Sequence, residues 1–252
     1  MLSQEQKQFF HANGYLLLEN LLSSAELAEA RSQMNTLLTH RAEAPHGVGF
    51  SMEPADSGQN WPFDPANPER VWMLFDTPLA GDWWLQNIRY PRIIGAMSDL
   101  LGPNINFHNG KARIKPPGYG SHQGWHQDFP YERHTSPDMA AAIFYLDDTA
   151  VGASATEVIP GSHLKGEWKH DEHTLIPDAD VQAFGTVPAA LSVKAGSAVI
   201  IHVLVVHRAT PNHTSQNRSA IINEYKTNET LDLWGNKCAF AELPLVRDGK
   251  IV

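Results

Sequence analysis

The sequence is poor in cysteine, with Cys238 the one cysteine in 252 residues. A single thiol excludes a disulfide within the chain and leaves too few sulfur ligands for a structural zinc site. Long apolar runs are also missing, since no window approaches the roughly 20 apolar residues that a membrane-spanning helix needs. The first ten residues contain neither the basic nor the apolar segment of a secretion signal. These absences predict a cytoplasmic protein with no membrane partner.

Positive charge is scarce as well. The chain has 19 Lys and Arg against 28 Asp and Glu, which gives a formal net charge of −9. Nucleic acids and anionic lipids bind proteins through clustered Lys and Arg, so neither is an expected partner. Hydrophobic residues make up 42% of the chain, and they are spread along its whole length. We therefore expect one globular domain over residues 1–252, acting on a small molecule. The oligomeric state is left open.

The N-terminal third, about residues 1–103, is predicted to be helical with one long loop. Two capping boxes, each a serine followed three residues later by Gln or Glu, predict helix starts, and Gly14 supplies a stop for the first helix. Pro, Gly, Asn and Asp are frequent between residues 43 and 71 and predict a loop of a length often found in active-site lids. The predicted elements are helices at 4–13, 23–42, 79–88 and 91–101, and a strand at 15–18.

From residue 105 the pattern changes to short runs of Ile, Val, Phe and Tyr separated by turn residues. Examples are Ala141 to Leu146, Ala198 to Val206 and Ser219 to Tyr225. Strands at such spacing are typical of a sandwich or barrel. Helices followed by strands predict a mainly β, α+β domain in which helices back one sheet. The expected β core spans about residues 104–227, followed by an extension over 228–252.

One candidate metal motif is the pair His126 and Asp128. Residues two apart on a strand project to the same face, so both side chains could reach one ion. With 13 histidines in the chain, chance alone would give roughly one such pair. The motif therefore needs support from elsewhere in the sequence.

Residues 196–225 supply that support. They are predicted to form two strands joined by a polar loop, with His207 ending the first strand and Arg218 opening the second. In an antiparallel pair these two residues would be close, at one end of the sheet. Two histidines and one carboxylate form the facial triad of non-haem iron(II) oxygenases, which leaves metal positions open. A guanidinium such as that of Arg218 binds carboxylates bidentately, as the distal end of 2-oxoglutarate requires.

At these residues the sequence resembles the phytanoyl-CoA dioxygenase family of iron(II)/2-oxoglutarate enzymes. The similarity covers residues 105–227 well and the N-terminal third in general character. It implies a double-stranded β-helix, the jelly roll, with flanking helices. It also implies that His126, Asp128 and His207 bind Fe(II), that Arg218 holds 2-oxoglutarate, and that O2 is a co-substrate. The matching blocks, in the family's order, are Trp125-His126-Gln127-Asp128, Pro160-Gly161-Ser162-His163, and His207-Arg208-Ala209 with Asn212 and Arg218.

Further contacts are less determined by the resemblance. Thr156 stands where the family has a residue near the co-substrate, although Ala153 and Ser154 replace the family's frequent Asn-Gly pair before it. Lys111 and Asn109 lie on the preceding strand, and either could reach 2-oxoglutarate. Three aromatic residues are candidates for the substrate pocket: Trp61, Phe63 and Tyr131.

Other aromatic and histidine residues are expected to be structural. Trp72, Trp83 and Trp84 lie within or beside predicted helices, and Trp125 should point away from its ligand neighbours, so all four are expected to pack in the core. His202 is five positions from His207 and should face the opposite side of their strand. His163 is expected to stabilise a turn, and residues 169–173 to form a solvated loop.

The acid at position 128 bears on the reaction. Halogen-transferring relatives have a small residue there, so Asp128 favours hydroxylation or another oxidation of a metabolite or natural-product intermediate, with release of succinate and CO2. The same iron chemistry also supports desaturation, epimerisation, cyclisation or endoperoxide formation. The alternative from another class is a jelly-roll module that binds metal or ligand without turnover. A structural metal would not need the carboxylate clamp that Arg218 provides.

Overall fold

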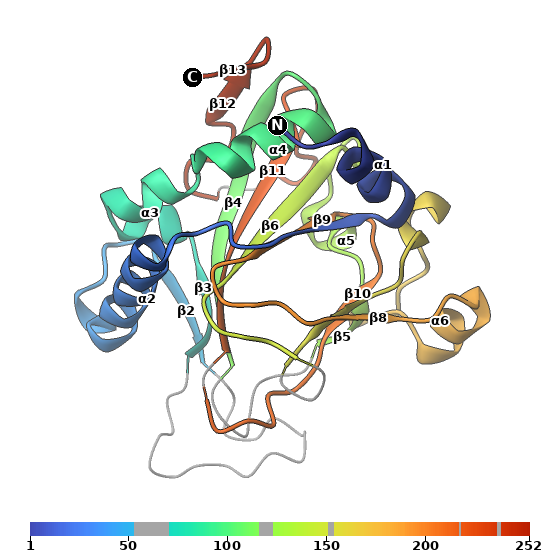
Figure 1. Cartoon of the computed structure of the whole chain (residues 1–252), viewed down its shortest axis with the longest axis horizontal. Helices are drawn as coiled ribbons and strands as arrows, with labels where there is room; N and C mark the ends of the chain where they lie inside the picture. The colour runs from blue at the N-terminus through green and yellow to red at the C-terminus, as the bar shows by residue number, and fades with distance from the viewer. Residues whose placement is uncertain (53–70, 116–122, 151–153, 217, 236–237) are drawn as a thin grey trace.

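The computed structural model describes residues 1–52, 71–115, 123–150, 154–216, 218–235 and 238–252. Two antiparallel sheets face each other, with helices covering the outer side of the larger one (Figure 1). The larger sheet runs β1-β9-β6-β11-β4-β12-β13, and β3 joins β2 to the side of β4. Its strands are β1 (Tyr15–Leu18), β2 (Gly49–Met52), β3 (Val71–Phe75), β4 (Ile105–Lys115), β6 (Met139–Tyr145), β9 (Ala198–His202), β11 (Arg218–Thr227), β12 (Pro244–Arg247) and β13 (Lys250–Ile251).

The smaller sheet runs β5-β10-β7-β8. Its strands are short because each one ends where the chain turns to cross to the larger sheet or to a loop. They are β5 (Gln123–His126), β7 (Thr156–Val158), β8 (Ala189–Leu191) and β10 (His207–Ala209). The prediction of a mainly β, α+β jelly roll is confirmed.

The main hydrophobic core lies between the larger sheet and the N-terminal helices. Apolar residues from α2, α3 and α4 pack there against alternate residues of β4, β6 and β11, among them Ala112, Phe144 and Ile221. In Figure 1 these helices lie on one side of the sheet, and the smaller sheet with α6 lies on the other. The helices are α1 (Gln4–Asn13), α2 (Ser24–Thr39), α3 (Asp82–Asn87), α4 (Pro91–Leu101), α5 (Phe129–Glu132) and α6 (Asp178–Phe184).

The first helix begins and ends as its sequence predicts. The Ser3 hydroxyl accepts a hydrogen bond from the Gln6 backbone N–H at 3.2 Å, and the Gln6 side chain accepts one from the Ser3 N–H at 2.9 Å. Gly14 ends the helix at φ +80°, where a side chain is unfavourable. The capping box at Ser23 also forms, but α2 ends at Thr39 and a 3-10 turn follows, so the expected end near 42 was too late.

We expect Gly14→Ala to lower the free energy of unfolding by about 1–3 kcal/mol. A Cβ at this left-handed position would lie 2.6 Å from Nδ1 of His163 and 3.0 Å from Cγ2 of Val205. Both distances are too short for a relaxed Cβ, so the end of α1 would have to move away from His163 and Val205. Gly95→Ala in α4 is the matched control, because a Cβ there meets no atom within 4 Å. That variant should be neutral or stabilising, and equal melting temperatures for the two variants would contradict the prediction.

Two predicted segments are different in the structure. The expected strand over residues 198–206 is β9 alone, because the chain turns after His202 and enters the smaller sheet as β10. A backbone hydrogen bond from Val205 N–H to His202 O, at 2.9 Å, closes this turn. The expected loop over 43–71 contains β2, which joins the larger sheet because it pairs with β3 and β3 pairs with β4. Its remaining residues 53–70 lie outside the described part of the chain.

Strand alternation on the larger sheet directs polar side chains away from the helices and toward the smaller sheet. On β4 these residues are Asn109, Lys111 and Arg113. A register shift between Glu224 and Tyr225 leaves one extra residue on β4. Such a bulge reverses the alternation, so Phe107 and Tyr225 both enter the helix-side core.

Candidate functional site

A cavity of about 600 Å³ lies between the two sheets. It is lined by residues from β3, β4, β6 and β11 on one side and from β5, β7 and β10 on the other. Trp61 and Phe63, two of the predicted substrate contacts, lie outside the described residues. Every other predicted site residue lines this cavity: Asn109, Lys111, His126, Asp128, Tyr131, Thr156, His207 and Arg218.

His126, Asp128 and His207 converge at one end of the cavity. Nε2 of His126 lies 3.6 Å from Oδ1 of Asp128, and Nε2 of His207 lies 3.8 Å from the same oxygen. The ligand atoms of all three residues lie within 4.8 Å of one another, a spacing at which one ion could contact all three. Nitrogen, nitrogen and a carboxylate oxygen on one face are the donor set of a non-haem iron(II) site with open positions.

The local backbone explains why these side chains meet. His126 ends β5, where it pairs with His207 of β10. Asp128 is not on the strand, as the sequence motif had suggested, but in αR conformation at the start of α5. Its N–H binds Val203 O at 3.0 Å. The fully buried Gln127 side chain donates to Leu204 O at 2.6 Å, which fixes the segment beside the turn before β10.

Backbone carbonyls orient both imidazole rings. Nδ1 of His126 lies 2.8 Å from Gly124 O, and Nδ1 of His207 lies 3.1 Å from Val205 O. With Nδ1 protonated and donating, each Nε2 presents a lone pair to the cavity. Burial, and then the neighbouring His207, lower the pKa of His126 well below its ordinary value. A neutral ring is the form that binds a metal, so the residues present fit an iron ion.

The Pro-Gly-Ser-His block and the residue before it hydrogen-bond to the backbone next to His207. The Ser162 hydroxyl accepts a hydrogen bond from the Val206 N–H at 2.8 Å, and the Ile159 N–H donates to Val206 O at 2.8 Å. His163 binds the carbonyl of His11 through Nε2 at 3.1 Å, as expected of a residue that stabilises a turn. This block therefore fixes the backbone immediately before the metal ligand.

Arg218 faces the same cavity from β11 of the larger sheet. Its side chain is buried, lies with its guanidinium carbon 4.9 Å from the centre of the Tyr145 ring, and donates from Nη2 to the Thr156 hydroxyl at 3.2 Å. Among the described residues, nothing accepts a hydrogen bond from its Nε. A buried cation with an unused donor fits an anionic ligand, because unpaired buried donors are costly. Thr156 also lies 2.8 Å from the Tyr145 hydroxyl, which holds it in place.

The expected relation between His207 and Arg218 was wrong in one respect. The two residues are not neighbours in an antiparallel pair, because β10 pairs with β5 and β7 whereas β11 pairs with β4 and β6. The chain crosses between the sheets, so His207 and Arg218 line one cavity from opposite sides. A ligand in this cavity would therefore lie between the metal-facing residues and the guanidinium.

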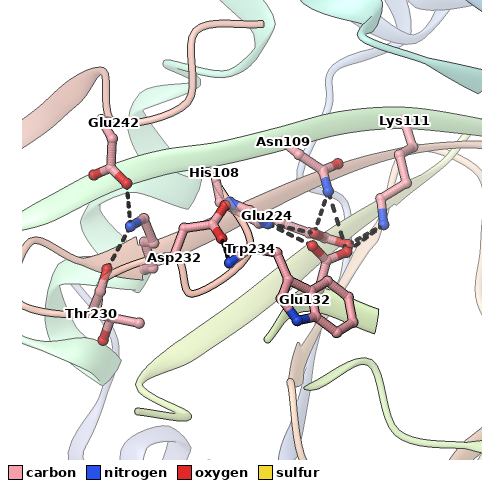
Figure 2. A network of polar contacts seen from close by, with 10 residues as sticks. His108, Asn109, Lys111, Glu132, Glu224, Thr230, Asp232, Trp234 and Glu242 are labelled. Carbon is pink, nitrogen blue, oxygen red and sulfur yellow. Dashed lines mark hydrogen bonds and ion pairs between the residues drawn. The ribbon is translucent and has the colours of Figure 1, made fainter. Parts of the chain in front are cut away.

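Lys111 and Asn109 line the cavity but bind carboxylates. Lys111 Nζ lies 3.0 Å from Oε1 of Glu132 and 2.7 Å from Oε1 of Glu224. Asn109 Nδ2 donates to Oε2 of Glu224 at 2.8 Å and to Oε1 of Glu132 at 3.3 Å. Figure 2 shows the two carboxylates together beside these side chains. Because both side chains are engaged with the carboxylates, the choice between them as co-substrate contacts stays a prediction.

His108 completes this buried acidic cluster, with Nε2 2.6 Å from Oε2 of Glu132. The bulge on β4 allows His108 and Asn109, adjacent in sequence, to contact the same carboxylates. Burial opposes the charge on Lys111, but Glu224 and Glu132 outweigh it and raise its pKa. Burial and the nearby Glu132 raise the pKa of Glu224 well above its ordinary value. His108, Glu132 and Glu224 lie close enough to hold an ion, yet the Lys111 ammonium already bridges the two carboxylates.

This cluster and two aromatic contacts were not predicted from the sequence. The period-two spacing of Arg218, Ile222 and Glu224 along β11 could have placed Glu224 on the inner face. Trp72 was wrongly expected beside a helix; it lies on β3, lines the cavity, and stacks on Arg113 with the guanidinium carbon 5.3 Å from the ring centre. Tyr145, which packs under Arg218, was counted only as a strand residue.

The expectations of structural roles are confirmed for several residues. Trp84 is buried in the main core, and Trp125 packs with Ile159 and Trp168 in a cluster near α6. His202 does not line the cavity and packs near His163, with ring centres 5.2 Å apart. In the described part of the chain, no helix is long and apolar enough to cross a membrane.

Known proteins share both the sequence pattern and the fold. The chain is 25% identical over 246 residues to a probable alpha-ketoglutarate-dependent hypophosphite dioxygenase of Stutzerimonas stutzeri, covering 93% of this chain and 82% of that protein. The structure of EctD from S. alaskensis with 2-oxoglutarate and 5-hydroxyectoine has a TM-score of 0.77 at 18% identity, covering 90% of this chain and 77% of the other. The carbocyclase SnoK from nogalamycin biosynthesis has a TM-score of 0.75 at 21% identity, covering 92% and 86%.

The structural likenesses are low in identity and establish the fold. The family is established by a sequence model, that of the phytanoyl-CoA dioxygenases, which matches residues 10–220. The match includes the three metal-facing residues, the Pro-Gly-Ser-His block and Arg218. By this match over most of its length, the chain belongs to the phytanoyl-CoA dioxygenase family.

Proposed function

We propose that His126, Asp128 and His207 bind iron(II) and that Arg218 binds the distal carboxylate of 2-oxoglutarate, for the oxidation of a small molecule in the cytoplasm. As a member of its family, the chain is an oxidoreductase of the iron(II)/2-oxoglutarate type that uses O2. One observation carries the residue assignment. A buried guanidinium, whose Nε has no acceptor among the described residues, faces the three metal-facing side chains across one cavity.

The residues have separate tasks in this proposal. The bound iron would supply oxidising power for breaking a C–H bond, coupled to conversion of 2-oxoglutarate into succinate and CO2. Gly124 O and Val205 O orient the two imidazoles, and burial favours the neutral form of His126 by lowering its pKa. Arg218 and Thr156 bind and orient the co-substrate. The apolar side chains of Ile143 and Ile222 limit the water near the reacting atoms.

Hydroxylation is the outcome we favour, because Asp128 occupies the ligand position that halogen-transferring relatives leave vacant. Relatives whose names include a dioxygenase for ectoine and a hydroxylase for L-proline act on small molecules. Two neighbours in fold are named a carbocyclase and an epimerase. Cyclisation and epimerisation therefore remain alternative outcomes of the same site, to be separated by product analysis.

The test is the anaerobic addition of iron(II) and 2-oxoglutarate to the protein. We expect a weak visible charge-transfer band that requires both components, since a bidentate 2-oxoacid on iron(II) absorbs there. Admission of air should then convert 2-oxoglutarate to succinate. No band would refute the proposed ligands. A band without succinate, whatever candidate substrate is present, would instead favour the non-catalytic binding module.

A further inference from the structure

The cavity has two ends of different charge. At the metal end, iron(II) would be balanced by Asp128 and the carboxylate of 2-oxoglutarate that joins the metal, and Arg218 by the distal carboxylate. The other described lining residues with charged side chains are three acids and two bases: Asp76, Glu132, Glu224, Lys111 and Arg113. With all five groups ionised, one negative charge is left over once iron and co-substrate are bound. The raised pKa of Glu224, caused by burial and by the nearby Glu132, reflects this unmatched charge, and a cation bound beside Glu224 would offset it.

The excess charge is concentrated at Glu132 and Glu224. Both carboxylates are buried, at 6% exposed each, and they share the single ammonium of Lys111. Oε1 of Glu224 accepts from Lys111, and Oε2 from Asn109. A carboxylate oxygen can accept two hydrogen bonds, so each of these oxygens has capacity for a further donor. His108 contacts Glu132 at 2.6 Å but lies 4.0 Å from Glu224, so Lys111 is the one Lys or Arg that pairs with Glu224 among the described residues. Two close carboxylates that share one ammonium favour the approach of a second cation.

A separate observation also indicates a donor ligand. The Asn109 side chain is 6% exposed and lines the cavity, and its Oδ1 has no hydrogen-bond partner among the described residues. Because Nδ2 is committed to both carboxylates, the amide cannot turn to satisfy this oxygen without facing oxygen toward oxygen. Unpaired buried acceptors are rare in native proteins and mark a missing partner. An N–H group of a ligand would supply that partner.

We propose that the substrate carries a cationic nitrogen, an ammonium or guanidinium group, which Glu132 and Glu224 bind at the end of the cavity away from Arg218. This inference rests on the proposed function and names the substrate class of the same site. An anionic substrate would meet two carboxylates on either side of Lys111, in a cavity that 2-oxoglutarate has already entered with two negative charges. Glu132 ends α5, about one helical turn after Asp128, and both residues line the cavity, so a small substrate held by the glutamates lies within reach of the metal end.

The experiment uses the protein loaded with iron(II) and 2-oxoglutarate and a panel of L-proline, L-lysine and Nα-acetyl-L-arginine. Each is compared with a counterpart that has no cationic nitrogen: N-acetyl-L-proline, Nα,Nε-diacetyl-L-lysine and Nα-acetyl-L-citrulline. Succinate formation and the melting temperature are measured for each. We expect at least one cationic compound to stimulate succinate formation, or to raise the melting temperature, more than its counterpart without a cationic nitrogen does. Failure of the proposed function would appear earlier, as loss of the visible band before any amine is added.

Glu224→Gln and Glu132→Gln test whether these two carboxylates bind the cationic nitrogen of the substrate. Each should raise the KM for the stimulating amine, or its Kd where only the melting temperature responds, by at least about tenfold. The KM for the co-substrate and the visible band should be unchanged, which shows that the variants are folded. The matched control is Glu242→Gln, because Glu242 also pairs with a buried lysine, Lys226, but does not line the cavity. Equal responses to the cationic compounds and to their counterparts without a cationic nitrogen would overturn the proposal. An unchanged KM or Kd for the cationic compound in both glutamine variants would also overturn it.

Discussion

Asp128→Ala should lose 2-oxoglutarate turnover, with succinate formation falling by more than about 100-fold. Removing a residue that hydrogen-bonds to a metal ligand lowers metal affinity or activity by about 10- to 100-fold. Asp128 is a proposed ligand itself, so a larger loss is expected. The carboxylate is also the one anionic donor among the three converging residues. Its removal leaves two neutral imidazoles to hold a divalent ion. Iron content after anaerobic loading, the visible band and succinate formation are the measurements.

Asp180→Ala provides the matched control for this substitution. Asp180 is an exposed carboxylate in the first turn of α6, outside the cavity lining. Its removal should leave iron content and turnover close to those of the unchanged protein. Undiminished iron binding and turnover in Asp128→Ala would show that the metal is held by other residues.

Arg218→Gln is the second large effect, and it should act on 2-oxoglutarate rather than on iron. Truncating one partner of a buried, hydrogen-bonded charge pair costs about 2–5 kcal/mol, so the KM for the co-substrate should rise by about 30-fold or more. The buried position over Tyr145 leaves little room for water to replace the guanidinium. Iron binding should persist, because the three converging side chains are untouched. Steady-state succinate formation against the concentration of added 2-oxoglutarate measures the change.

Two further variants are expected to change the KM for 2-oxoglutarate less than Arg218→Gln does. Thr156→Val removes one hydroxyl from beside the guanidinium while keeping the side-chain shape, so a smaller rise in the co-substrate KM is expected. Arg89→Gln removes an arginine whose Nη1 binds the Val252 carbonyl at the surface, and it should leave this KM unchanged. If Arg218→Gln and Arg89→Gln had the same co-substrate KM, 2-oxoglutarate would be anchored elsewhere.

The parts of the site that local sequence could predict were those encoded by spaced motifs. The three metal-facing residues and Arg218 belong to blocks that keep their order in the family, and Thr156 precedes one of these blocks. All five line one cavity. Helix starts were predicted equally well, because a capping box acts within four residues and needs no tertiary contact. The corresponding hydrogen bonds form at Ser3 and Ser23.

The parts that could not be predicted depend on contacts distant in sequence. Residues 198–206 cross between the sheets because β9 pairs with β6 in the larger sheet, whereas β10, which follows, pairs with β5 in the smaller one. Both partner strands lie more than fifty residues earlier in the sequence. The acidic cluster depends on a bulge, where a one-residue register shift brings His108 to the same carboxylate as its neighbour Asn109. A bulge alters the alternation on which inner and outer faces are predicted.

The short strands at the borders of the larger sheet affect how the protein can associate with copies of itself. Among the described strands, its edges are β1, β2 and β13, with four, four and two residues. Short edge strands offer few unpaired backbone groups to a second chain, and Lys250 on β13 adds a charge that opposes strand addition. Contact between two copies through a continuous intermolecular sheet is therefore disfavoured. Self-association at the larger sheet is expected to use side-chain surfaces and not backbone pairing with these edge strands.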